Sequence, residues 1–394
     1  MVQRRPTSSP LGVISVRSVG MVVLICLGLA VFAGLIWNAV SQKPPRAQEA
    51  CRVPEPVCGA VASVFRISAH DPFASAVRIS ADELVTSKRV VLDREQVLVH
   101  LPDGQSIEGE VVPSAFGGDL ALIRARLPEG PALKVSDRSG GVLHIVALDR
   151  ASRAIAATPA GEAIMPLHAT APGAHLHHTV PAQRGSSGGA LVDDEGGLVA
   201  IQTLSGRQRS EAVPARQIAV LTQASGAHQK TASQHRGKAY RTCMAIAGQA
   251  TRVSDVLPDN IAKEMITACL DSGARDLIEE AGKILSKSRM QDKAAALFAR
   301  ALEIDPNAID AHLGRSIVLG IQGRHREALV DVRWMLDAAP WDRDVQRAAL
   351  QASKAASDRA LIARTLALIA KHDPTALEAA KSFVGVTNAP LPRL

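Results

Sequence analysis

The residues most capable of chemistry lie in one short glycine-rich loop. Ser187 stands in GSSGGALVD, between the strand-like runs HTVPAQ and GLVAIQTL. Glycines at 185, 188 and 189 permit a tight backbone that directs the N–H groups of Gly185 and Ser187 toward one point. Acyl transfer by a serine needs such a turn, a base that takes the hydroxyl proton and a carboxylate that orients the base. The loop therefore predicts a nucleophile site, and its base has to be sought elsewhere in the chain.

The elements that must position Ser187 are short strands. From about residue 60 to 222 the chain consists of strand-length apolar runs, among them SAVRIS, ELVTSKRVVL, QVLVHL, SIEGEVV, LALIRARL and VLHIVAL. Hairpin signals such as PDG at 102–104 and DEGG at 194–197 separate several of them. Many short strands at this spacing are typical of a β-barrel or β-sandwich, so the pattern predicts an all-β domain.

Several of these segments resemble a known family. GSSGG resembles the nucleophile loop of trypsin-like serine proteases, and ELVTSKRVV, GGDLALIR and SEAVPARQI resemble, in the same order, segments of the HtrA (Deg) branch. The resemblance implies two six-stranded β-barrels packed face to face, with the active site in the cleft between them. It also implies that Ser187 is the nucleophile, that Asp119 is the orienting carboxylate and that Gly185 helps to form the oxyanion hole.

The base that the resemblance requires is missing. Arg89 stands where the family has histidine. A guanidinium stays protonated at any ordinary pH and only donates hydrogen bonds, so it does not accept the serine proton. We therefore expect catalytic loss, with Arg89 paired to Asp119. Three alternatives remain open: a desolvated Lys88 as base in a Ser–Lys arrangement, a swing of His100 or His144 into the site, or a route outside the family pattern.

A histidine-rich run raises the question of a metal. In an extended strand His175 and His177 project on the same face about 7 Å apart, a spacing that holds a transition metal. No carboxylate or cysteine lies near them in the sequence, so a solvated strand is the favoured interpretation. We expect neither a metal nor a cofactor.

The N-terminal region predicts a membrane anchor. No charged residue occurs between Arg17 and Lys43, and the span is long enough to cross a bilayer as a helix over 18–42. Arginines precede it and acidic residues do not, so the first residues are expected in the cytoplasm and the body outside. This places the protein in a bacterial inner membrane as a single-pass protein with a periplasmic body. A cleaved signal peptide is the alternative.

Cysteine usage agrees with an exported body. One cysteine lies in the apolar segment, and four others remain as Cys51, Cys58, Cys243 and Cys269. The last two fall at opposite ends of two helix-like stretches, where an antiparallel hairpin brings them together. Two disulfides fit an oxidising compartment, and four buried thiols are the alternative.

The C-terminal half is alanine-rich and helical in pattern. Prolines recur at Pro306, Pro340 and Pro374, each 34 residues from the last, and Ala294, Phe298 and Ala301 have the spacing of helix-packing positions. This resembles tetratricopeptide repeats, whose stacked helix pairs leave a concave groove for a protein or peptide partner. A helical cap without a ligand is the alternative. The expected multidomain order is cytoplasmic tail 1–17, transmembrane helix 18–42, linker 43–59, trypsin-like double β-barrel 60–224, linker 225–238, helical hairpin 239–272 and repeats 273–394.

Composition narrows the function classes. The 394 residues are 47% hydrophobic, which indicates folded domains. The net charge of +7 comes from scattered Arg and Lys with 3% aromatic residues, which argues against a nucleic-acid partner. Two functions remain: a membrane-anchored periplasmic pseudoprotease that acts as a binding scaffold through its repeats, or an active envelope serine endopeptidase that uses Ser187 with a non-standard base.

Overall fold

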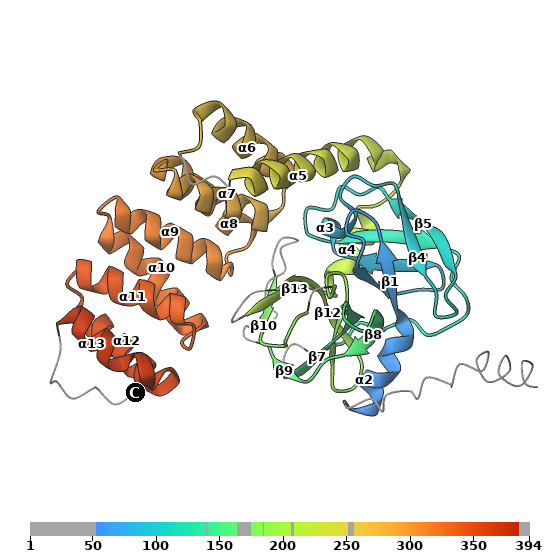
Figure 1. Ribbon diagram of the computed structural model, residues 1–394, viewed down its shortest axis with the longest axis horizontal. Helices are drawn as coiled ribbons and strands as arrows, with labels where there is room; N and C mark the ends of the chain where they lie inside the picture. Colours follow the sequence, from blue (N-terminus) through green and yellow to red (C-terminus); the bar gives the residue numbers. More distant parts are fainter. Residues whose placement is uncertain are drawn as a thin grey trace, which may run out of the picture. The chain divides into compact units, whose positions relative to one another are not determined.

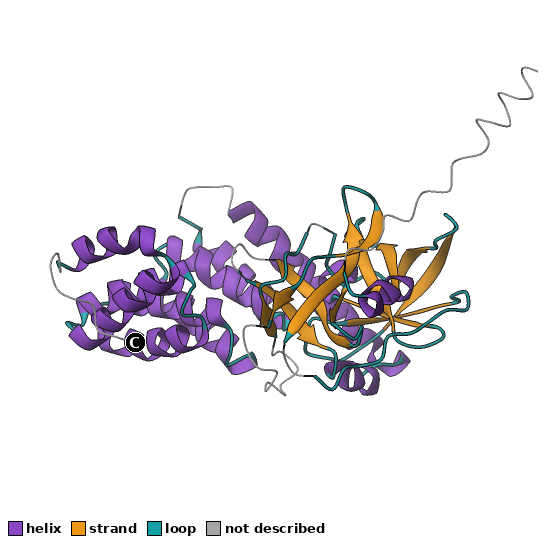
Figure 2. Ribbon diagram, turned by 90° about the horizontal axis from the view of Figure 1, so that it is seen from below, coloured by secondary structure: helices purple, strands orange, loops and turns teal. Residues whose placement is uncertain are grey.

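Apart from the short helices α2 and α3, the strands precede the helices along the described chain, as the colours of Figure 1 show. Figure 2 shows the two classes of element in different colours. The computed structural model describes residues 53–138, 141–163, 175–183, 185–205, 209–250 and 256–385. In this part of the chain no helix combines the length and apolar character that a membrane crossing requires. The expected span 18–42 and Cys51 lie outside the described residues.

The first β-domain is a closed barrel of six strands. The strands follow one another around it in the order β1-β2-β3-β6-β5-β4. Short branched side chains such as Ile67, Val99 and Ile123 fill its interior with no exposed surface. The short helices α2 (Glu55–Ala60) and α3 (Lys88–Val91) flank it, and its strands are β1 (Val64–Ser68), β2 (Ala74–Arg78), β3 (Glu83–Thr86), β4 (Gln96–His100), β5 (Ser106–Val112) and β6 (Ala121–Ala125).

The second β-domain is a seven-stranded sheet and differs from the six-stranded barrel that the resemblance implies. Its order is β10-β13-β12-β11-β7-β8, and β9 pairs with the part of the long strand β7 that β8 leaves free. A bridge between Ala163 and His178 links the β9 side back to β10. The strands are β7 (Val142–Asp149), β8 (Ala154–Ala157), β9 (Gly161–Glu162), β10 (Leu176–His178), β11 (Ala190–Asp193), β12 (Leu198–Ser205) and β13 (Ser210–Pro214).

The helical region repeats with the period that the prolines predict. Helices α7, α9 and α11 begin 34 residues apart, as do α8, α10 and α12, and the three prolines lie in the turns after the second set. Neighbours within the set α7, α9 and α11 contact one another, so these helices form one layer. The helices are α4 (Gln217–Gln223), α5 (Lys230–Ala250), α6 (Asp259–Ser272), α7 (Arg275–Lys287), α8 (Gln291–Ile304), α9 (Ile309–Ile321), α10 (His325–Ala338), α11 (Arg343–Ala355), α12 (Arg359–His372) and α13 (Leu377–Val384).

The predicted packing positions of the first repeat are buried. Ala294 and Ala301 expose no surface, and Phe298 exposes 1%. The Phe298 ring lies against Gly282 of α7 and Gly314 of α9, where a Cβ on Gly314 would lie 2.3 Å from a ring carbon. Glycine is therefore required for the close approach of these helices.

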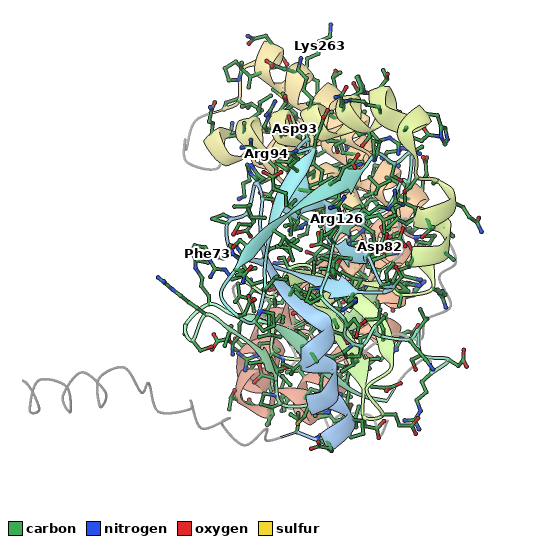
Figure 3. All side chains as sticks on the ribbon, turned by 90° about the vertical axis from the view of Figure 1, so that its right-hand side faces the viewer. Phe73, Asp82, Asp93, Arg94, Arg126 and Lys263 are labelled. Carbon is green, nitrogen blue, oxygen red and sulfur yellow. A yellow bond between two sulfur atoms is a disulfide. The ribbon has the colours of Figure 1, made fainter. Side chains whose placement is uncertain are left out.

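The stretch 225–238, expected as a polar linker, is largely helical because it packs on the first barrel. Helix α5 already begins at Lys230. Its Arg236 donates to the carbonyls of Ala115 and Phe116 at 2.5 and 3.0 Å. Asp93, labelled in Figure 3, pairs with Arg241 of α5 at 2.8 Å. These tertiary contacts favour helix in a sequence whose polarity indicated a linker.

The expected disulfide between Cys243 and Cys269 is confirmed. It joins α5 to α6, and both cysteines are fully buried. Around it, Tyr240, Met265 and Phe298 belong to one apolar cluster that extends from α5 to α9. The hairpin 239–272 therefore shares its core with the repeats that follow it.

Loss of this disulfide should weaken the helical region. Its two cysteines are 26 residues apart in the chain, and a loop of that size corresponds to about 3–4 kcal/mol of lost unfolded-state entropy. Reduction should lower the urea midpoint of the wild-type helical signal in circular dichroism, while the Cys243→Ala/Cys269→Ala variant should be lower from the start and insensitive to reductant. Equal midpoints for reduced and oxidised wild type would contradict the bridge.

Candidate active site

Ser75 of β2 holds the loop that carries Ser187 against the first barrel. Its N–H donates to the Ser187 carbonyl at 2.9 Å, and its hydroxyl donates to the Gly185 carbonyl at 3.1 Å. The same hydroxyl accepts the Leu148 N–H at 2.8 Å. Sequence reasoning missed Ser75, because nothing in its strand pattern marks a residue that joins the two β-domains.

Glycine is obligatory beside the nucleophile. Gly188 has a φ of +80°, and a Cβ there would lie 2.0 Å from Thr86 Oγ1 and 2.1 Å from the Ser75 carbonyl oxygen. Gly185, the expected oxyanion residue, has a φ of +101°. The GSSGG pattern therefore produces the sharp turn that the sequence predicts, pressed against the first barrel.

Asp119, the expected orienting carboxylate, is bound by Ser87 and Arg89. Its Oδ2 accepts the Ser87 hydroxyl at 2.9 Å, and its Oδ1 accepts the Arg89 backbone N–H at 3.2 Å. Arg89 Nε lies 3.5 Å from Asp119 Oδ2, so the expected ion pair forms. Burial raises the pKa of Asp119, an effect that the Arg89 charge opposes.

Arg89 also has a second partner, which the sequence did not indicate. Its Nη2 donates to Asp276 Oδ2 of α7 at 2.5 Å, across 187 residues of chain. Burial lowers the pKa of Arg89, but Tyr240 and the carboxylates of Asp276 and Asp119 outweigh it, so the pKa is raised. Arg89 is thus a fixed cation between two carboxylates, one beside the barrel and one in the helical region.

The Ser187 hydroxyl has no base beside it in the described residues. It donates to the Thr203 carbonyl at a long 3.4 Å. His100 is hydrogen-bonded to Ser68 and Ser106 at 2.8 Å each, within the first barrel. His144 Nδ1 lies 3.1 Å from the Thr158 carbonyl. Both alternative histidines are therefore occupied away from the serine.

Lys88, the other alternative base, lines a small cavity with Asp119 and the start of α7. The cavity holds about 20 Å³, room for one water-sized group, and Tyr240 and His175 also line it. Ser187 is not among its lining residues. Burial lowers the pKa of Lys88 to about 8, with the Arg236 charge adding to the effect.

A buried ionic cluster around Arg275 joins the second β-domain to the helices. Arg275 of α7 pairs with Glu211 of β13 and with Glu279 of its own helix. Its Nε lies 3.6 Å from Asp305 Oδ2, and its side chain exposes 2% of its surface. Glu211 stands across the ladder from Leu204, next to the Thr203 whose carbonyl accepts the serine hydroxyl. Two contacts therefore join the first residues of α7 to the surroundings of the candidate site. Arg275 pairs with Glu211, and Asp276 pairs with Arg89.

His175 and His177 face the same carboxylate, as their spacing predicts for one strand face. His175 Nδ1 lies 2.8 Å and His177 Nδ1 lies 3.7 Å from the Glu211 oxygens. His177 Nε2 also lies 3.1 Å from the Asn307 carbonyl. Both rings are buried, so the solvated strand that was expected here is wrong. Across the described residues no group of three or more His, Cys, Asp and Glu side chains is arranged to hold a metal ion.

Comparison with known proteins identifies the domain type. Residues 74–201 match the family described as the trypsin-like peptidase domain, so the β-region is a trypsin-like domain followed by a helical region. No curated protein matches the chain.

The solved structures that resemble the chain include three proteases. The inactive form of the Rv3671c protease of M. tuberculosis is 18% identical over 45% of this chain and 99% of its own, with a TM-score of 0.38. The serine endoprotease of Yersinia pestis is 22% identical over 43% of this chain and 64% of its own, with a TM-score of 0.35. The HtrA-type protease AlgW, solved with a tripeptide, is 24% identical over 43% of this chain and 61% of its own, with a TM-score of 0.37.

Replacing Lys88 tests the electrostatics of this site. Because the folded-state pKa is near 8, the buried charge costs stability at about pH 7, and the cost disappears as pH rises between about 8 and 10.5. Lys88→Met should therefore raise the free energy of unfolding by roughly 2–3 kcal/mol at about pH 7 and by much less at about pH 10. Urea unfolding at both pH values measures this, with the exposed Lys293→Met as the control. A gain that is equal at both pH values would contradict the depressed pKa.

Proposed function

We propose that this protein is a membrane-anchored pseudoprotease of the HtrA type whose body acts as a protein-binding scaffold in the bacterial periplasm. The observation that carries the proposal is Arg89 at the base position, paired with Asp119 and with Asp276. A permanently charged guanidinium in that place blocks proton transfer from Ser187 and neutralises the carboxylate that would orient a base.

The contacts of the helical region support the same conclusion. A working protease has to admit an extended polypeptide beside its serine. Here α7 is bound to the trypsin-like domain at two residues, since Asp276 pairs with Arg89 and Arg275 pairs with Glu211. Buried ion pairs of this kind are costly to break one partner at a time. We therefore assign the repeats two roles: they close over the trypsin-like domain, and their layer α7, α9 and α11 receives a partner.

The proposed location rests on sequence and on the disulfide. The bond between Cys243 and Cys269 is a cross-link typical of exported proteins. The apolar span 18–42, preceded by arginines, supplies the anchor and the orientation.

Fluorophosphonate labelling tests the inactivity of Ser187. Wild type should not label, because loss of the base in a serine protease costs about 10⁶-fold in turnover. Arg89→His places an imidazole beside Asp119 and should give slow, measurable labelling that Ser187→Ala abolishes. Labelling of the wild type at ordinary protease rates would establish the alternative function, an active endopeptidase with a non-standard base.

Arg89→His has two effects: it supplies a base, and it removes the contact that holds α7. A matched variant separates these two effects. Arg89→Gln also removes the cation that binds Asp276, but it supplies no base. If the imidazole is what matters, Arg89→Gln stays unlabelled. If Arg89→Gln labels as well as Arg89→His, closure by α7 and not the missing base kept the serine idle.

Protease treatment of spheroplasts tests the anchor. The upstream arginines predict that the body is digested from outside while a short fragment ending near residue 43 stays in the membrane. Immunoblots against an N-terminal tag and against the helical region distinguish the fragments. A protected body would reverse the orientation, and a soluble, shortened protein would show that the span is a cleaved signal peptide.

A further inference from the structure

One arginine of the trypsin-like domain is bound by two repeats at once. Arg209, just before β13, donates from Nη2 to Asp310 and from Nη1 to Asp342. Asp310 lies in the first turn of α9, and Asp342 is the N-cap of α11, so the carboxylates come from neighbouring helices of the same layer. A single planar guanidinium thus bridges successive repeats, a geometry that its fixed fork of donors allows.

The carboxylates of Asp310 and Asp342 need a cation between them. The Asp342 side chain exposes 1% of its surface. Its Oδ1 caps α11 by accepting the N–H groups of Asp344 and Val345 at 2.8 and 3.2 Å, which leaves Oδ2 for Arg209. Lys283 of α7 lies 3.2 Å from the other oxygen of Asp310. A carboxylate buried this deeply costs several kcal/mol if its partner leaves.

We propose that Asp310 and Asp342 form an arginine-binding site of the repeats, which Arg209 fills in the closed chain and which an arginine of a partner protein segment fills when the repeats are engaged. This inference rests on the proposed scaffold function and specifies which side chain the partner must carry. A guanidinium satisfies both carboxylates, whereas a lysine ammonium presents one point charge to two acceptors. The partner segment is therefore arginine-bearing.

The ligand chemistry can be tested by chemical rescue. Arg209→Ala in the full chain leaves a guanidinium-sized gap and should lower the thermal midpoint of the helical region. Millimolar ethylguanidinium should restore that midpoint, and ethylammonium should not. Adding Asp342→Asn, which keeps the capping oxygen and removes the charge, should abolish the rescue. Equal rescue by both cations, or rescue that survives Asp342→Asn, would overturn the assignment.

Binding in trans tests the partner claim. The probe is a fluorescein-labelled peptide with the sequence of residues 204–213 and glutamine in place of Arg207. The double variant Arg209→Ala/Asp276→Asn, called the opened chain here, empties the site and removes one of the two contacts that hold α7. It should bind the peptide about ten-fold more tightly than wild type, where the tethered Arg209 competes. Adding Asp310→Asn or Asp342→Asn should remove that gain, while Asp337→Asn, on an exposed position of α10, should leave it.

The outcomes separate this site from the proposed function. Failure of the peptide to prefer the opened chain, or equal binding of a lysine version, overturns the arginine site and leaves the inactivity of Ser187 untouched. Fluorophosphonate labelling of the wild type overturns the pseudoprotease and leaves the arginine site standing. Circular dichroism of each variant shows whether lost binding reflects lost charge or lost fold, and Asp310→Asn, which caps no helix, decides the case if Asp342→Asn unfolds.

Discussion

The constraint on which the rest of the structure depends is the burial of arginine charges between the trypsin-like domain and the helices. Arg275 exposes 2% of its side chain and has carboxylates from both regions around it. A guanidinium cannot neutralise itself by losing a proton, so each buried arginine fixes the positions of its acids. Arg89 and Arg209 act in the same way, with carboxylates of α7, α9 and the α11 cap as partners. Arg89, where the resemblance implies a histidine, thus acts as a tie between the barrel and α7.

The nucleophile loop also has a structural role. Ser75 binds the carbonyls of Ser187 and Gly185, and Gly188 packs with no room for a side chain between Thr86 and the Ser75 backbone. These contacts hold the two β-domains together through backbone atoms of the loop, whatever its hydroxyl does. The motif therefore has a packing role that does not depend on turnover.

The sequence predicted the parts of the fold that local pattern controls. Strand-length runs, the glycine turn at Ser187, the pairing of Arg89 with Asp119 and the Cys243–Cys269 hairpin all follow from neighbours in sequence or from a family order. The ion-pair partners Asp276, Glu211 and Asp305 did not, because a pair between residues far apart in the chain leaves no periodic trace in the sequence. A charged residue is expected to be solvent-exposed until its partner is known. The helical state of 230–238 was missed for the same reason, since the barrel carbonyls that Arg236 binds are far away in the chain.

Charge complementarity also limits what can open the closed chain. The ties between the domains are pairs of buried ions, which gain little net stability when made but cost much when a single partner is removed. An apolar segment that displaced α7 would take Arg275 from Glu211, and one that displaced the Arg209 segment would leave the buried Asp342 without a counter-charge. A segment that carries guanidinium groups supplies new partners for the carboxylates whose arginines it displaces. Under the proposal that the repeats receive a partner, an arginine-bearing segment is therefore the class whose entry keeps Asp310 and Asp342 paired.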